Sequence, residues 1–98
     1  MKIHKTTNQT AITLAIEGRL DTTTAPELET VVRNEINGIT DLTFDLKALE
    51  YISSAGLRVL LAAQKIMNKQ GSMVITGCND EILEIFDITG FSDILTIQ

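Results

Sequence analysis

The sequence of 98 residues contains one cysteine, one proline and no tryptophan, and it has no long hydrophobic run. The single cysteine, Cys78, cannot form an internal disulfide, and no CxxC or Cys/His spacing typical of a zinc site occurs. The longest apolar run, 59–63, is far too short to cross a bilayer, and the N-terminus lacks the apolar core of a signal peptide. We therefore expect a soluble cytoplasmic protein with no membrane segment, metal or cofactor.

Basic residues are also scarce, because eight of them stand against thirteen acidic ones and leave a formal charge of −5. The basic residues are scattered and form no stripe that would neutralise the phosphates of a nucleic acid. This pattern argues against nucleic-acid binding and favours a protein partner with a basic face.

Motifs of catalysis are missing as well. The chain has no GxSxG, GxGxxG or GxxxxGK[ST] motif, and its only histidine, His4, belongs to an expected surface strand near the start of the sequence. No paired carboxylates flank the candidate nucleophiles, which are serines in the middle of the chain. We therefore predict a binding protein and not an enzyme.

The hydrophobic pattern predicts one α/β domain over residues 1–98. Residues 2–7 are expected to form a hairpin with a half-buried strand that Gly18 ends, and three apolar residues alternate in that strand: Ile12, Leu14 and Ile16. A capping box at Thr24–Glu27 predicts a helix that reaches about Asn37. Its buried stripe is expected to contain Leu28, Val31, Val32 and Ile36.

The second half of the chain predicts a strand, a helix and a parallel strand over residues 42–76. The first strand contains Leu42, Phe44 and Leu46, the helix begins near Ser53 or Ser54 and ends at Gly71, and the last strand is Met73–Thr76. A third helix, capped by Asn79, is expected to bury Ile82, Ile85 and Phe86 before Gly90. Residues 91–97 fit either a short helix or a strand.

The serine turn, defined here as residues 51–57 (Tyr51-Ile52-Ser53-Ser54-Ala55-Gly56-Leu57), places two hydroxyls and a glycine where an extended segment becomes a helix. The first N–H groups of a helix have no internal partner, so this position favours a phosphate or another anion. Serine is also an ordinary N-cap. Because ligands gather at the carboxyl ends of strands, we expect the loop 18–24 to lie beside the serine turn.

Three segments of the sequence resemble the motifs of the STAS domain family, which is named for sulphate transporters and anti-sigma factor antagonists. They are Glu17–Asp21, Phe44–Leu60 and Ile85–Phe91, in the order and spacing of the family. The resemblance implies a mixed four- to five-stranded sheet with about four helices packed mainly on one face. For a free-standing domain of this length it also implies an anti-sigma factor antagonist.

The resemblance further implies partner switching. The unphosphorylated antagonist would bind an anti-sigma factor that is usually also a serine kinase, phosphorylation would end that binding, and a phosphatase would restore it. By the resemblance, the phosphoacceptor maps onto Ser54. The family often has an aspartate just before the acceptor, whereas this sequence has Ser53, which becomes a rival acceptor. The expected partner-binding residues are Asp21, Thr22, Thr23, Tyr51, Ser53, Ala55, Gly56 and Arg58.

Other functions remain open from the sequence. A regulated scaffold of the same family would bind a partner other than an anti-sigma factor, and weak nucleotide binding beside the serine turn is a further alternative. Asp21 also has two interpretations. It is either a residue that contacts the partner or a turn residue, which is a common role for an aspartate before a helix. Arg58 is either a solvated side chain or a ligand of a phosphate on Ser54. We expect a monomer or a weak dimer.

Overall fold

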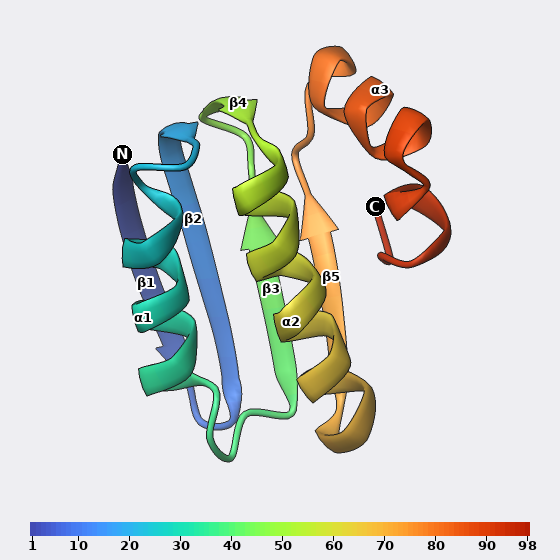
Figure 1. Ribbon diagram of the computed structural model, residues 1–98. Coiled ribbons are helices and arrows are strands. Elements are labelled where there is room, and N and C mark those ends of the chain that lie inside the picture. The colour runs from blue at the N-terminus through green and yellow to red at the C-terminus, as the bar shows by residue number, and fades with distance from the viewer.

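The alternating residues of the second strand lie in the middle of a five-stranded sheet in the computed structural model, which describes residues 1–98 (Figure 1). The strands are β1 (Lys2–Asn8), β2 (Ala11–Leu20), β3 (Asp41–Asp45), β4 (Leu49–Ile52) and β5 (Ser72–Thr76). The helices are α1 (Ala25–Glu35), α2 (Ser54–Gln70) and α3 (Asp80–Thr89), followed by the single 3₁₀ turn η1 (Phe91–Asp93). The mixed α/β class is confirmed, although three α-helices and a short turn replace the expected four helices.

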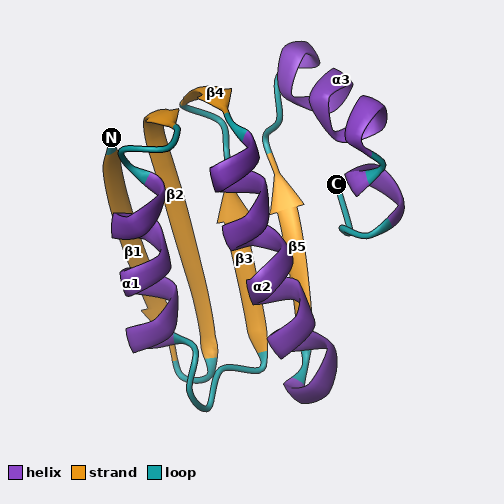
Figure 2. Ribbon diagram, in the orientation of Figure 1, coloured by secondary structure: helices purple, strands orange, loops and turns teal.

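Helices α1 and α2 lie side by side on one face of the sheet, and α3 lies beyond the end of β5 (Figure 2). The strand order is β1-β2-β3-β5, with β4 paired to β2. Strand β1 is antiparallel to β2 and forms the expected hairpin, whereas the other pairings are parallel. The predicted parallel pair around α2 is therefore confirmed, because β3 pairs directly with β5.

Strand β2 changes its partner along its length. Its first half pairs with β3, and its last three residues pair with β4 through Gly18↔Leu49, Arg19↔Tyr51 and Leu20↔Ile52. Gly18 was expected to end the strand, and this prediction is wrong, since β2 continues to Leu20. Gly18 instead has a φ of +99° at the point where the register shifts, a conformation that favours glycine.

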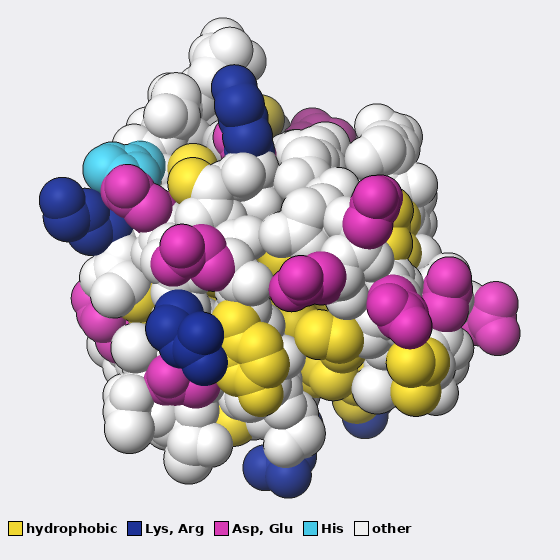
Figure 3. Space-filling model, turned by 90° about the horizontal axis from the view of Figure 1, so that it is seen from above, with side chains coloured by type: hydrophobic (Ala, Val, Ile, Leu, Met, Phe, Trp, Pro, Cys, Tyr) yellow, Lys and Arg dark blue, Asp and Glu magenta, His cyan; other side chains and the backbone are white.

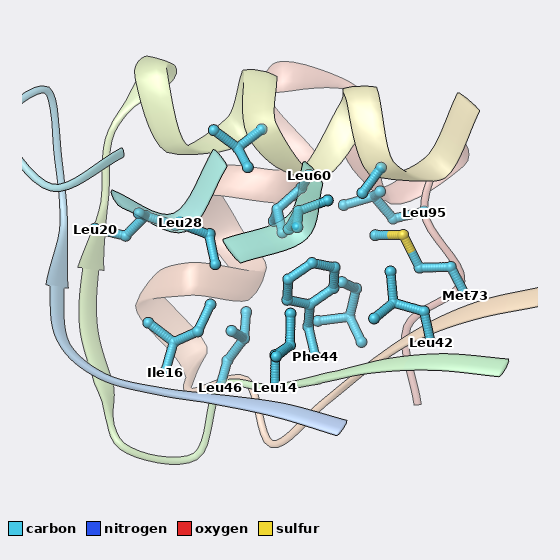
Figure 4. Close-up of a cluster of buried hydrophobic side chains, with 14 of the residues drawn as sticks. Leu14, Ile16, Leu20, Leu28, Leu42, Phe44, Leu46, Leu60, Met73 and Leu95 are labelled. Carbon is cyan, nitrogen blue, oxygen red and sulfur yellow. The ribbon is translucent and has the colours of Figure 1, made fainter. Parts of the chain in front are cut away.

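One hydrophobic cluster fills the space between the sheet and the helices (Figure 4). Side chains of β2 and β3, including Leu14, Ile16 and Phe44, point toward the helices, from which Leu28 and Leu60 close the cluster. Burial of one such side chain contributes ~1.5–3 kcal/mol. The predicted apolar faces are thus buried, with Val31 and Ile85 only half-buried at their margins: Leu28, Val32, Ile36, Leu42, Phe44, Leu46, Ile82 and Phe86.

Helix α2 ends at Gly71, as expected, because of a close backbone contact. Its φ is 172°, so the position needs no left-handed backbone. A Cβ atom there would lie 2.0 Å from the carbonyl oxygen of Thr40, so only glycine fits against this neighbouring backbone. Near the C-terminus, η1 is followed by a single bridge between Ile97 and Ile75, so residues 91–97 contain both a helical turn and an extended contact. No helix has the length and apolarity that a membrane crossing requires.

Candidate functional site

The short parallel pairing of β2 and β4 brings the two expected site segments together. Leu20 pairs with Ile52, and the backbone N–H of Ser53 donates to the carbonyl oxygen of Leu20 at 2.9 Å. The chain leaves both strands at the same end of the sheet, as Figure 1 shows at its upper edge. The loop 21–24 and the serine turn therefore form one surface, as the sequence predicted.

The two serines at the start of α2 lie in different environments. Ser53 is the N-cap, and its carbonyl oxygen accepts from the N–H of Leu57 at 3.0 Å. The Oγ atom of Ser53 is buried and has no hydrogen-bond partner, so its side chain does not cap the helix. Ser54 is the first helical residue and is exposed. The accessible hydroxyl of the turn is therefore that of Ser54.

Gly56 fixes the start of α2 against the sheet. A Cβ atom at this buried position would lie 2.6 Å from Cγ of Leu20 and 2.9 Å from Cγ1 of Ile52. The absent side chain thus permits close packing of the helix on β2 and β4. Gly56 positions the site from beneath, while its neighbour Ala55 is half-buried beside the surface.

The loop between β2 and α1 is closed by the carboxylate of Asp21. Its Oδ1 atom accepts from the hydroxyl of Thr23 at 2.7 Å, from the N–H of Thr23 at 3.0 Å and from the N–H of Thr24 at 3.1 Å. The bond from the Thr23 hydroxyl, together with the two N–H groups, lowers the pKa of Asp21 although partial desolvation opposes the shift. These hydrogen bonds are those of a turn residue, as one of the two interpretations of Asp21 predicted. They hold Thr22 and Thr23 at the surface.

The capping box predicted for α1 is wrong. Thr24 is the N-cap residue, but its side chain makes no bond to the first turn of the helix. Its hydroxyl instead accepts from the N–H of Asp21 at 2.8 Å and donates to the carbonyl oxygen of Arg19 at 2.9 Å. The hydroxyl is thus used to close the loop, and α1 ends at Glu35, before the expected Asn37.

Two basic side chains lie at the site, and sequence reasoning found only one of them. The Arg19 guanidinium lies over the Tyr51 ring, with 4.5 Å between Cζ and the ring centroid. Arg19 was missed because the strand was expected to end at Gly18. Strand β2 in fact continues to Leu20, and this places Arg19 at the end of the strand that leads into the site. Arg58, which the sequence did indicate, lies on α2 one turn after Ser54 and is exposed.

A groove between α1 and α2 begins beside the serine turn. Its volume is about 260 Å³, and Thr22 and Pro26 line one side while Ala55 and Arg58 line the other. Small-molecule sites are usually larger, at ~300–1,000 Å³. The remaining conspicuous residues lie elsewhere. His4 is exposed beside Glu17, and burial raises the pKa of the half-buried Cys78 thiol.

The model of the STAS domain matches residues 2–98, and the chain belongs to the STAS domain family. The family assignment suggested by the three sequence motifs is therefore confirmed. Among curated relatives, the anti-sigma-B factor antagonist of Staphylococcus aureus is 30% identical over 100 residues, covering 100% of this chain and 93% of that protein. BtrV of Bordetella bronchiseptica, provisionally named an anti-sigma factor antagonist, is 34% identical over 84 residues, covering 84% of this chain and 72% of that protein.

Solved structures of the anti-sigma factor antagonist SpoIIAA have the same fold. The unphosphorylated form has a TM-score of 0.79 at 12% identity and covers 99% of this chain and 87% of that chain. The phosphorylated form, described as a Bacillus cell fate determinant, has a TM-score of 0.78 at 12% identity and covers 99% and 91%. The chain thus shares its architecture with both forms of that protein and its family with the named antagonists.

Proposed function

We propose that this protein is an anti-sigma factor antagonist that binds its partner when unphosphorylated and releases it when Ser54 is phosphorylated. The names of the two curated relatives support the antagonist role. The partner is an anti-sigma factor that is also a serine kinase, and a phosphatase reverses the modification. That SpoIIAA was solved in a phosphorylated form supports phosphorylation as the switch.

The observation that carries the proposal is the difference between the two neighbouring serines. A kinase must reach the hydroxyl that it modifies, and Ser54 is exposed at the first position of α2. The Oγ atom of Ser53 is buried, so this side chain would first have to change its conformation before an enzyme reached the hydroxyl. Ser54 is therefore the acceptor and Ser53 a packing residue.

The start of α2 is also suited to receive the added charge. A phosphoserine carries about −1.5 to −2 charges at neutral pH, and the N–H groups of a helix start stabilise anions. The first turn of α2 contains no acidic residue that would repel the phosphate. Arg58 lies four residues beyond Ser54, a spacing that brings two side chains of a helix together.

The partner is then released because the phosphate changes the surface on which it docks, and not because the domain unfolds. The surface comprises the exposed Thr22 and Thr23, the Arg19–Tyr51 pair and the exposed residues around Ser54. A phosphate on Ser54 adds bulk and negative charge to the centre of this surface. A partner surface that fits the unphosphorylated protein does not match the added group. Because each ~1.4 kcal/mol changes affinity tenfold, a penalty of about 4 kcal/mol releases a submicromolar partner.

The first experiment locates the phosphate. The chain is purified from its native host as wild type, Ser53→Ala and Ser54→Ala, and each is analysed by mass spectrometry. We expect phosphate on Ser54 in the wild type and in Ser53→Ala, and none on Ser54→Ala. Ser53→Ala is the matched control because it removes the adjacent hydroxyl. Phosphate found on Ser53 would contradict the assignment.

The second experiment measures the switch. Immobilised Ser54→Ala is expected to retain a kinase-like protein from the native host, and Ser54→Asp is expected to lose it. Ser53→Ala should behave like the wild type before phosphorylation. Equal retention by Ser54→Ala and Ser54→Asp would show that charge at this position does not control binding.

A further inference from the structure

The net charge of the chain is concentrated in its last third. Residues 1–70 contain all eight basic residues and eight acidic ones, so they are formally neutral. Residues 71–98 contain five acidic residues and no basic one: Asp80, Glu81, Glu84, Asp87 and Asp93. All five lie on α3 or on η1, and none forms an ion pair within the chain. The whole formal charge of −5 thus belongs to one element and the turn that follows it.

Exposed isoleucines lie among these carboxylates. Ile88 on α3 is 76% exposed, the highest value of any large hydrophobic side chain in the protein, and Ile94 after η1 is 47% exposed. The buried face of α3 contains Ile82 and Phe86. At 100° per residue, Ile88 lies on the opposite face, where Glu84 is its i−4 neighbour. Figure 3 shows acidic side chains with hydrophobic ones between them on the α3 side of the molecule.

We propose that α3 and η1 form a second docking surface, which binds a basic amphipathic helix of a partner protein. The exposed Ile88 and Ile94 supply the apolar contact, and the unpaired carboxylates of α3 and η1 attract lysine and arginine side chains that flank an apolar stripe. Binding removes isoleucine surface from water and relieves repulsion among five like charges. A nucleic acid is excluded as the occupant by the same negative charge.

This surface is distinct from the site at the serine turn. A cleft of about 530 Å³, lined by residues 47–50 and 79–81, lies between the start of α3 and the loop before β4. Ile88 is two turns beyond that cleft along α3. A partner on α3 therefore does not require an unmodified Ser54, and it remains bound in both phosphorylation states.

The proposal is tested first with a defined probe, an 18-residue helical peptide of leucine and lysine in amphipathic spacing. Titration into ¹⁵N-labelled protein is expected to shift amide signals of residues 80–94 more than those of 51–58. Ile88→Ser should weaken binding about tenfold because an isoleucine contact is lost, and Glu84→Gln should weaken it several-fold at low salt. Ile66→Ser is the matched control, since Ile66 is 41% exposed on α2. Equal weakening by Ile66→Ser, or shifts centred elsewhere, would overturn the proposal.

A second measurement uses a photo-crosslinking amino acid at position 88 or position 66 in the native host. We expect one heterologous adduct from position 88 that is absent from position 66, is reduced several-fold by Glu84→Lys and persists in Ser54→Asp. An adduct of twice the chain mass would assign the face to a second copy and overturn the proposal. An adduct lost in Ser54→Asp would also overturn it, because it would join this surface to the serine-turn site. Neither result depends on whether Ser54 is the phosphoacceptor.

Discussion

The starts of α2 and α3 solve the same chemical problem in opposite ways. At α3, the side chain of Asn79 accepts from the N–H of Ile82 at 2.8 Å, and Asp80 and Glu81 place negative charge in the first turn. At α2, the N-cap Ser53 makes no side-chain bond, and the first turn contains no acidic residue. The positive end of α3 is thus compensated within the chain, whereas that of α2 is left for an anion to occupy.

Packing replaces capping at the start of α2. Gly56 rests on Leu20 and Ile52, and the N–H of Ser53 bonds to the carbonyl oxygen of Leu20. The position of the turn is therefore fixed from below, through buried contacts with β2 and β4. The start of α2 is thus open to an anion and at the same time firmly packed.

The largest expected effect breaks this packing. Gly56→Ala places a methyl group 2.6 Å from Cγ of the fully buried Leu20, so it should lower the free energy of unfolding by ~1–3 kcal/mol despite the better helix propensity of alanine. Urea denaturation measures the change. Ser54→Ala in the same turn is the control and should stay within about 0.5 kcal/mol of the wild type. Equal stability of the Gly56→Ala protein would mean that α2 is not held by this contact.

The next effect compares the two caps directly. Asn79→Ala removes the bond to Ile82 and should cost ~1 kcal/mol of unfolding free energy. Ser53→Ala should cost nothing or stabilise slightly, because it removes a buried hydroxyl that has no partner. The two variants are measured side by side by thermal unfolding. A loss in Ser53→Ala as large as that in Asn79→Ala would contradict the description of α2 as uncapped.

A smaller effect tests the anion site itself. Phosphoserine incorporated at position 54 should leave the fold intact and raise the unfolding free energy by ~0.3–1 kcal/mol at low salt, because the charge lies at a helix start. Amide spectra should change around 51–58 and 18–24 only. Phosphoserine at position 87, on the acidic α3, is the control and should destabilise by repulsion. Shifts spread across the sheet would refute a local switch.

The smallest effect concerns the neighbouring loop and pH. Hydrogen bonds lower the pKa of Asp21 in the folded protein, so the unfolded chain takes up its proton first as the pH falls. The stabilisation is therefore complete above the ordinary aspartate pKa and is lost as the pH falls through the lowered value. Between pH 6 and pH 2, wild type should lose slightly more stability than Asp21→Asn. Parallel unfolding curves for the two proteins would show that the bonds are not formed in solution.

The sequence predicts most of the fold because the apolar periodicity of its main elements is clear. Strand β4 was not foreseen, since Leu49 to Ile52 has two exposed residues between two buried ones and does not alternate. The capping box failed because the Thr24 hydroxyl instead bonds to the N–H of Asp21 and to the carbonyl oxygen of Arg19. Both failures depend on backbone contacts that apolar periodicity and motif spacing do not contain.

The candidate site, too, was predicted from the sequence only in part. The position of the two serines at a helix start follows from the sequence, as does the proximity of the loop 18–24. The difference between Ser53 and Ser54 depends on side-chain orientation and on the packing of α2 against β2. Two adjacent serines look alike in the sequence, so the sequence does not indicate which hydroxyl is buried and which is exposed.

The partner change in β2 has a consequence for the order in which the protein opens. Ile12 and Leu14 are paired with strands on both sides, whereas residues 51–53 are tied to the sheet by a few pairs beyond the register shift. In hydrogen exchange, we expect amides of the first group to be released by global unfolding, and those of the serine turn by local opening at a lower free energy. We therefore expect the proposed partner surface to exchange its amides faster than the core, while the domain beneath it stays folded.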